Sequence, residues 1–163
     1  MKKINILIST FFGYGYFTKI PGTVTSLVTA VFIYIAYEHL EYTDLKFSII
    51  FFTLLFFYSF YAVKDAESEF KNKDPRQIVI DEVLGQAMPL ILVLYLSQKN
   101  QLSLSIEIYY LISFLSFRFF DIIKPFPVSY FDKNFKNYFG IIMDDIMAGF
   151  YSMLVIYLIR LKF

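Results

Sequence analysis

Residues 47–63 read Phe47-Ser-Ile-Ile-Phe-Phe-Thr-Leu-Leu-Phe-Phe-Tyr-Ser-Phe-Tyr-Ala-Val63 and carry no charged side chain over 17 residues. An uninterrupted apolar run close to the ~20 residues of a standard span is typical of a transmembrane helix. Inside a bilayer a helix pairs its own backbone polar groups, so this is the structure that such a run favours. The sequence therefore predicts a membrane protein.

Four further apolar stretches accompany this segment, and they cover Thr23–Tyr37, Val83–Leu96, Leu104–Phe117 and Ile146–Ile159. Several are shorter than ~20 residues, a difference that helix tilt or local bilayer thinning accommodates. A buried core helix of a soluble bundle has the same pattern. That alternative stays open for Val83–Leu96 and Ile146–Ile159, the third and fifth stretches in chain order. We expect an all-α fold, a polytopic membrane helical bundle of about four to five apolar helices, in one domain over residues 1–163.

The composition supports a lipid-facing protein and excludes several chemistries. Hydrophobic residues make up 58% of the chain and charged residues only 18%, which is too little polar surface for a soluble domain of this size. There is no cysteine and a single histidine, His39, so a thiolate metal site, a Cys nucleophile or a His-based triad is difficult to build. The net charge of +1 gives no case for a nucleic-acid partner.

The distribution of basic residues predicts which side of the membrane carries the polar motifs. If all five stretches cross, the N-terminal segment, loop 64–82 and loop 118–145 share one side. That side holds 11 basic residues, namely Lys2, Lys3, Lys19, Lys64, Lys71, Lys73, Arg76, Arg118, Lys124, Lys133 and Lys136. The other side holds four, namely Lys46, Lys99, Arg160 and Lys162. An excess of Lys and Arg marks the cytoplasmic side, so we expect the motif-bearing loops to face the cytoplasm.

Two pairs of consecutive acids stand beside apolar sequence. Asp144-Asp145 lies between Ile-Ile-Met and Ile-Met-Ala, where a purely structural pair carries a heavy desolvation cost. Asp81-Glu82 lies where a polar loop enters an apolar helix. Acids at that position also suit a helix N-terminus, so a structural and a functional interpretation are both open for the second pair.

A third polar group repeats every three residues. Arg118, Asp121 and Lys124 would share one face of a helix, and the prolines at positions 125 and 127 would end that helix. One interpretation is a structural Asp–Lys pair at the membrane surface. The other is a phosphate-binding Arg and Lys, with the Asp as a metal ligand or an orienting group.

A glycine-containing segment precedes the first apolar helix. It includes Gly13, Gly15 and Gly22, followed by Thr23 and Ser26. The pattern is typical of a turn and helix cap, whose free N–H groups also suit an anion. The spacing fits neither a P-loop nor a dinucleotide fingerprint.

Brought to one side of the membrane, these groups suit a metal and a phosphate. Carboxylate oxygens without Cys or nearby His favour a hard cation, most plausibly Mg²⁺. Lys124, Arg118 or Arg76 would offset the remaining charge of a phosphate. A site at the lipid boundary points to hydrolysis of a phosphomonoester on a lipid head group.

The motifs also resemble those of a known family. They are Pro21-Gly22-Thr23, Ile80-Asp81-Glu82, Phe117-Arg118-Phe-Phe-Asp121-Ile-Ile-Lys124-Pro125-Phe-Pro127 and Gly140-Ile-Ile-Met-Asp144-Asp145-Ile-Met-Ala148-Gly149. In order and near spacing they are similar to the motifs of the phosphatidylglycerophosphatase A family, and Asp132 also matches a family acid. The resemblance implies a Mg²⁺-dependent enzyme of the bacterial inner membrane. It would remove the terminal phosphate of phosphatidylglycerophosphate to give phosphatidylglycerol.

These observations lead to one hypothesis for the site residues. We expect Glu82, Asp144 and Asp145 to hold Mg²⁺, and we assign catalytic roles to Asp81, Asp121 and Asp145. The substrate-binding residues in this hypothesis are Thr23, Ser26, Arg118 and Lys124. An activated water attacks phosphorus and an acid takes its proton. A covalent Asp nucleophile is the alternative mechanism, and the sequence does not separate the two.

Two rival functions use similar residues. A CDP-alcohol-type lipid phosphotransferase also has acids and Mg²⁺ at the membrane boundary, but its Asp-Gly…Ala-Arg…Gly…Asp arrangement is not found here. A non-enzymatic ion-coupled transporter predicts acids near the middle of the spans, whereas here they stand at the ends of the apolar stretches. The sequence does not fix the oligomeric state.

Overall fold

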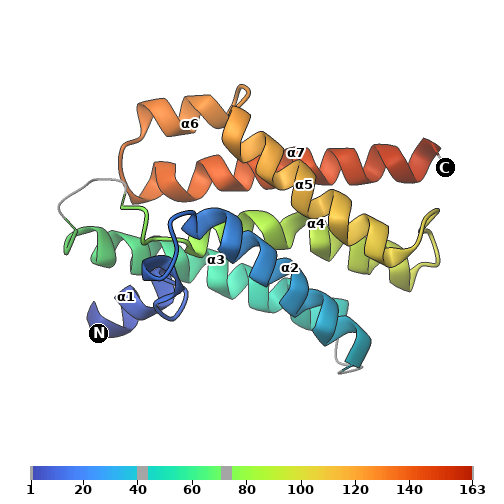
Figure 1. Cartoon of the computed structure of the whole chain (residues 1–163), viewed down its shortest axis with the longest axis horizontal. Coiled ribbons are helices and arrows are strands. Elements are labelled where there is room, and N and C mark those ends of the chain that lie inside the picture. Colours follow the sequence, from blue (N-terminus) through green and yellow to red (C-terminus); the bar gives the residue numbers. More distant parts are fainter. Residues whose placement is uncertain (1, 40–43, 71–74, 163) are drawn as a thin grey trace.

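The chain folds as a helical bundle. A computed structural model describes residues 2–39, 44–70 and 75–162, and these form seven α-helices and one 3₁₀ turn, without a strand among them (Figure 1). The elements are α1 (Lys2–Ser9), η1 (Tyr14–Tyr16), α2 (Pro21–His39), α3 (Leu45–Glu67), α4 (Ile80–Gln98), α5 (Ile106–Ile123), α6 (Val128–Asn134) and α7 (Tyr138–Lys162). The all-α prediction is confirmed.

Three of these helices, α3, α4 and α7, are long and apolar enough to cross a membrane. Each of the five predicted apolar stretches lies in its own helix, although 104–117 begins two residues before α5. Helix α5 carries Glu107, Arg118 and Asp121, which lowers its apolar character. The structure therefore supports a membrane helical bundle with three candidate spans, fewer than the four to five that we predicted.

The helix ends separate into two groups (Figure 1). One end of the bundle, which we call the polar end, contains α1 and α6. It also contains the starts of α2, α4 and α7 and the ends of α3 and α5. The opposite end holds the C-terminus, the ends of α2 and α4 and the starts of α3 and α5. Along the chain, the long helices therefore alternate in direction. The cytoplasmic location of the polar end stays a prediction, and Lys71 and Lys73, which entered its count, lie outside the described residues.

Helices α4 and α7 pack closely because small residues face each other. A side-chain Cβ on Gly149 would lie only 2.5 Å from the carbonyl oxygen of Gly85. A Cβ on Gly85 would overlap the ring of Phe117, which α5 places across the pair. Small residues at such crossings let two helix backbones approach. The close approach brings the acidic starts of α4 and α7 side by side.

Helix α3 lies at the periphery of the bundle. In its most apolar stretch only 17% of the residues are buried inside the protein, against 50% in the corresponding stretches of α4 and α7. Its outward side chains Phe47, Phe51, Leu54 and Phe57 are each more than half exposed. A surface this apolar suits lipid chains, whereas α4 contacts α2, α3, α5 and α7 and forms the centre of the bundle.

Candidate active site

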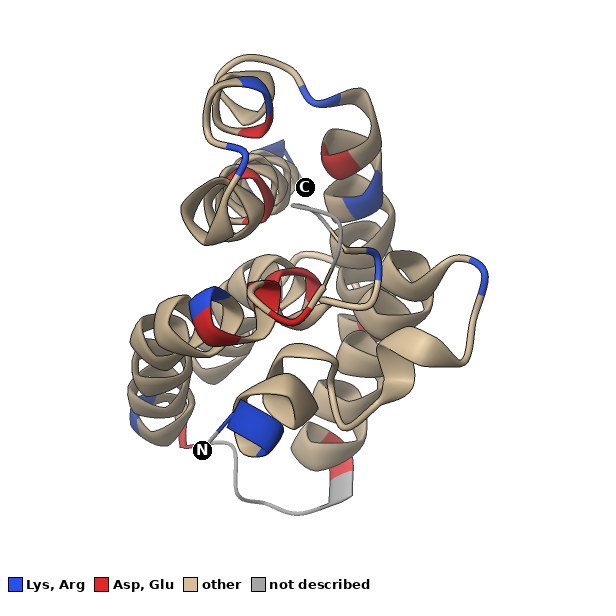
Figure 2. Cartoon of the chain, turned by 90° about the vertical axis from the view of Figure 1, so that its left-hand side faces the viewer, with Lys and Arg blue, Asp and Glu red and all other residues tan. Residues whose placement is uncertain are grey.

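A cavity of about 320 Å³ opens between the helices at the polar end. Its walls come from the start of α2, the segment that leads into α4, the end of α5, helix α6 and the start of α7. Figure 2 looks onto this end and shows acidic and basic positions of several helices around the middle of the bundle. The charged residues that line the cavity are Arg76, Asp81, Glu82, Arg118, Asp121, Lys124, Asp132, Lys136, Asp144 and Asp145.

Three carboxylates from three helices meet in the deep part of this cavity. Glu82 of α4, Asp121 of α5 and Asp145 of α7 each place one oxygen within 4.8 Å of the other two. Asp145 is only 3% exposed and Asp121 9% exposed. We call these residues the carboxylate triplet. Three anions this close repel one another unless cations offset their charge.

Arg118 supplies part of that compensation. Its Nη1 atom lies 2.5 Å from Glu82 Oε2 and 2.9 Å from Asp121 Oδ2. The contact with Asp121 is the one that the three-residue spacing predicted on a helical face. The Arg118 Nε–H is buried and has no hydrogen-bond partner among the described residues.

Helix α2 holds Glu82 from the other side. The Ser26 hydroxyl is fully buried and lies 3.0 Å from Glu82 Oε2 and 2.8 Å from the carbonyl oxygen of Gly22. A Cβ on Gly22 would overlap Glu82 Oε1, because the helix start passes directly against that carboxylate. Gly22 is therefore required for the packing of Glu82, a role that the turn-and-cap interpretation of this segment did not contain.

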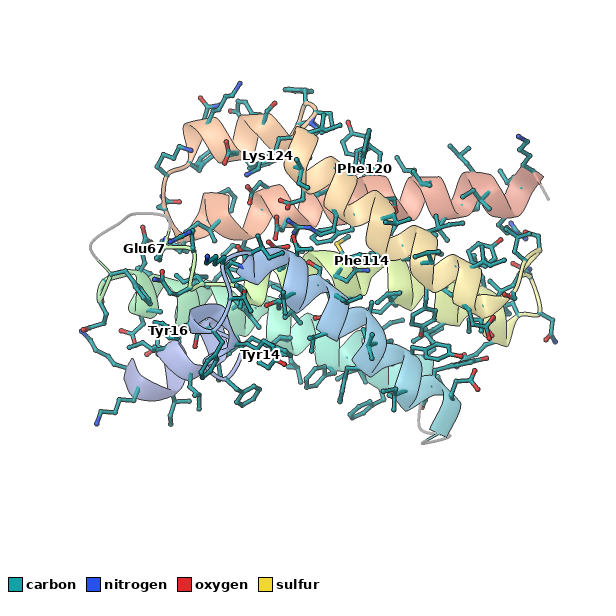
Figure 3. The ribbon with its side chains drawn as sticks, viewed as in Figure 1. Tyr14, Tyr16, Glu67, Phe114, Phe120 and Lys124 are labelled. Atoms are coloured by element: carbon teal, nitrogen blue, oxygen red, sulfur yellow. The ribbon has the colours of Figure 1, made fainter. Side chains whose placement is uncertain are left out.

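Lys124 organises a second ionic group. It follows the last residue of α5 with φ 48° and ψ 58°, a left-handed backbone that redirects its side chain. Its Nζ donates to Asp132 Oδ1 at 2.8 Å and to Asp144 Oδ2 at 2.6 Å. Figure 3 shows Lys124 reaching the space between α6 and α7.

The electrostatics of this group follow from its pairing. Burial alone would lower the pKa of Lys124, but Asp144 and Asp132 outweigh that effect, and the pKa is raised. Partial burial alone would raise the pKa of Asp132, but the hydrogen bond and charge of Lys124 lower it further than burial raises it. Both groups are therefore charged at neutral pH.

Asp132→Asn is expected to lower the free energy of unfolding at neutral pH by about 1 kcal/mol, because the pair with Lys124 is lost. Since the folded-state pKa of Asp132 is lowered, this contribution is present above the unfolded-state pKa of about 4 and disappears as the pH falls through the folded-state value. Thermal unfolding in detergent should separate the two proteins at pH 7 and bring them together in strong acid. Equal midpoints at pH 7 would contradict the assignment.

The consecutive acids Asp144 and Asp145 serve different neighbours. Successive residues of an α-helix point about 100° apart, and both residues lie within α7. Asp144 accordingly pairs with Lys124, while Asp145 joins the carboxylate triplet. The predicted metal-ligand role of Asp144 stays a prediction.

The remaining predicted residues lie in or beside the same cavity. Asp81 and Thr23 line it, whereas Ser26 is not among the lining residues and contacts Glu82 instead. The structure thus brings together residues from all four motifs, while their catalytic, metal-binding and substrate-binding roles stay predictions. Lys136, just before α7, also lines the cavity. No motif singled it out, and one Lys in a polar loop gives no pattern to follow.

The charge of the cavity suits a divalent cation. Its lining contains six acidic and four basic side chains, a formal excess of two negative charges. The carboxylate triplet offers three hard oxygen donors to one point, the ligand type of Mg²⁺. The residues present therefore fit the metal that the sequence suggested.

A bundle of apolar helices with a carboxylate and cation cavity at one end defines a class of protein, a membrane-embedded enzyme suited to phosphate esters. Comparison with known families specifies the class further. Residues 7–160 match the family described as phosphatidylglycerophosphatase A. The chain belongs to this family, which confirms the relationship predicted from the motifs and the assignment as a lipid phosphatase.

Individual relatives agree with this result. The chain is 33% identical over 165 residues to a phosphatidylglycerophosphatase A of Haemophilus influenzae, covering 98% of this chain and 94% of the relative. It is 27% identical to the protein of the same name from Escherichia coli, covering 94% and 81% of the two chains. A Bacteroides thetaiotaomicron protein named as a candidate phosphatidylinositol-3-phosphatase is also 33% identical, with 95% and 92% covered. No solved structure matches the chain.

Proposed function

We propose that this protein hydrolyses the terminal phosphomonoester of phosphatidylglycerophosphate to phosphatidylglycerol and phosphate. The reaction takes place at the cytoplasmic face of a bacterial inner membrane, as a step of phospholipid biosynthesis. The observation that carries the proposal is the carboxylate triplet of Glu82, Asp121 and Asp145, within 4.8 Å of one another beside Arg118. Family membership supplies the substrate class.

We assign the metal to the carboxylate triplet, so that Asp121 replaces Asp144 in the ligand set expected from the sequence, and Asp144 orients Lys124 instead. When bound, Mg²⁺ would offset the charge of the phosphate and favour ionisation of a water. The ligands come from three helices whose positions are fixed by packing at Gly85 and Gly149. The charge of this triplet is therefore placed before the substrate arrives.

The side chains of the cavity then have distinct tasks. Arg118 and Lys124 bind phosphate oxygens, because both cations line the cavity beside the carboxylates. A water attacks phosphorus while the bond from phosphorus to the glycerol oxygen breaks. Asp81, which lines the cavity beside Glu82, takes the proton of the water. Asp81 then returns this proton to the departing glycerol oxygen, through solvent in the cavity, so that an alcohol and inorganic phosphate leave.

The location of the acids argues against the transporter alternative. They stand near the starts of α4 and α7 and at the end of α5, toward one end of the bundle (Figures 1 and 2). An ion-coupled transporter places such groups near the middle of the membrane. A substrate whose head group enters from the polar end while its chains stay in lipid suits the observed arrangement.

Phosphate release by the purified protein in detergent tests the function. Phosphatidylglycerophosphate should be hydrolysed with Mg²⁺, and a chelator should stop the reaction until excess Mg²⁺ is added. Phosphatidylinositol 3-phosphate, offered in parallel, tests the activity named for the Bacteroides relative. CMP formation from a CDP-lipid would favour the phosphotransferase alternative. Absence of phosphate release from phosphatidylglycerophosphate under these conditions would reject the proposal.

A further inference from the structure

We propose that Arg76 and Lys136 form a second anion-binding subsite at the rim of the cavity, one that binds the inner phosphodiester of a head group carrying two phosphates. The inference rests on the proposed function for the identity of the reacting phosphate. It adds a site and a source of selectivity that the reaction itself does not require.

The deep cations of the cavity are already committed to carboxylates. Arg118 contacts Glu82 and Asp121, and Lys124 contacts Asp132 and Asp144. Each of these cations has two acidic partners within 3 Å. They can bind the phosphate that reacts beside the carboxylate triplet, but a second anion farther out needs other cations.

Arg76 meets that need on one wall. Its side chain is exposed, lines the cavity and makes no ion pair with any residue in ranges 2–39, 44–70 and 75–162. The backbone that carries it is held in place, because Ile78 N–H donates to the Pro75 carbonyl at 2.9 Å and both residues are buried. Gly15 packs against the carbonyl of Gln77 from the outer side. An exposed guanidinium on a fixed turn is suited to a phosphate ligand.

Lys136 lines the same cavity from the segment between α6 and α7. Its side chain is 55% exposed, and its Nζ is 3.8 Å from Asp132 Oδ1, an oxygen that Lys124 approaches to 2.8 Å. The start of α7 beside it is fixed by Asn137, whose Oδ1 accepts from Phe139 N–H and Gly140 N–H. Within the part of the chain that the structure describes, the one ion-pair contact of Lys136 is long and shared with Lys124, so little is lost when Lys136 binds an anion instead.

The two cations line the same cavity, and both side chains are exposed. Arg76 precedes α4 and Lys136 precedes α7, and these helices pack side by side. A head group whose outer phosphate lies beside the carboxylate triplet would place its inner phosphate, one glycerol unit nearer the lipid, toward this rim. Phosphatidic acid has a single phosphate and would leave the subsite empty. The subsite therefore favours two-phosphate head groups over a simple phosphomonoester lipid.

Steady-state hydrolysis of phosphatidylglycerophosphate and of phosphatidic acid by the full chain tests the subsite. Arg76→Gln and Lys136→Gln should each lower kcat/KM for phosphatidylglycerophosphate about tenfold, mainly through KM, and the double variant should lower it about a hundredfold. The rate with phosphatidic acid should not change. Lys19→Gln is the matched control, because Lys19 is an exposed cation of the same end that does not line the cavity. Equal losses on both lipids would overturn the proposal.

A binding measurement separates this inference from the proposed function. Glycerol bearing a phosphate at each end should bind the wild-type protein more tightly than glycerol 3-phosphate, and Arg76→Gln should remove the difference. If the protein releases no phosphate from either lipid, the proposed function fails and calorimetry with these two ligands still decides the subsite. Indistinguishable affinities in the wild-type protein would reject it.

Discussion

Asp145→Asn is expected to abolish phosphate release while the protein stays folded in the membrane. Asp145 is 3% exposed and belongs to the carboxylate triplet with Glu82 and Asp121. The amide is nearly the same size, so the change removes the negative charge of a proposed metal ligand and little else. A loss of about 4 kcal/mol of transition-state stabilisation corresponds to a fall of about a thousandfold in kcat/KM.

Stability should move in the opposite direction from activity. Without Mg²⁺ the triplet contains three close carboxylates, so replacing one by an amide relieves repulsion. The midpoint of thermal unfolding of Asp145→Asn in chelator should equal or exceed that of the wild-type protein. Glu69→Gln serves as the control, because Glu69 is an exposed acid at the same end that pairs with Lys2 and not with the triplet. Near-normal turnover by Asp145→Asn would remove the triplet from the mechanism.

Gly22→Ala is expected to lower kcat/KM about a hundredfold, although it adds only one methyl group. That group would overlap Glu82 Oε1, so the Glu82 carboxylate has to leave its position between Ser26 and Arg118. Moving a metal ligand away from its partners costs about 3 kcal/mol in such sites, which is the stated factor. Activity as a function of Mg²⁺ concentration measures the change, and the half-saturating concentration should rise.

A second substitution tests the steric explanation. Glu82→Asp shortens the acid by one methylene and withdraws its carboxylate from the alanine side chain. The Gly22→Ala, Glu82→Asp double variant should therefore be more active than Gly22→Ala alone. A double variant whose loss equals the combined losses of the single variants would show that the two residues do not act on each other.

The sequence located the apolar helices and the four motifs because hydropathy is local. A run such as 47–63 is a helix for reasons contained in that run. The convergence of Asp81-Glu82, Arg118-Asp121-Lys124 and Asp144-Asp145 also followed from counting crossings. Alternating segments return every second loop to the same end, and the cavity at the polar end contains all of these charged residues.

The parts that the sequence did not supply depend on contacts between distant segments. Predicted stretch 146–159 began after the Asp pair, whereas α7 begins at Tyr138 and carries both acids inside the helix. The hydropathy pattern placed the start of the stretch after the two charged residues. Hydropathy contains no information on the ion pair between Lys124 and Asp144, which lets the helix include them. Helix packing determines that Asp144 contacts Lys124 while Asp145 joins the triplet, and it also requires a glycine at position 22. Neither feature has a signal in the local sequence.

The three residues of the carboxylate triplet are distributed over α4, α5 and α7, and Ser26 of α2 supports Glu82. No two consecutive helices contain the complete set, so the proposed metal site forms only after α7 has docked against α4 and α5. A chain interrupted before residue 145 would carry the earlier acids yet remain inert. On the proposed function, a partly inserted product that lacks α7 would therefore not hydrolyse the surrounding lipids.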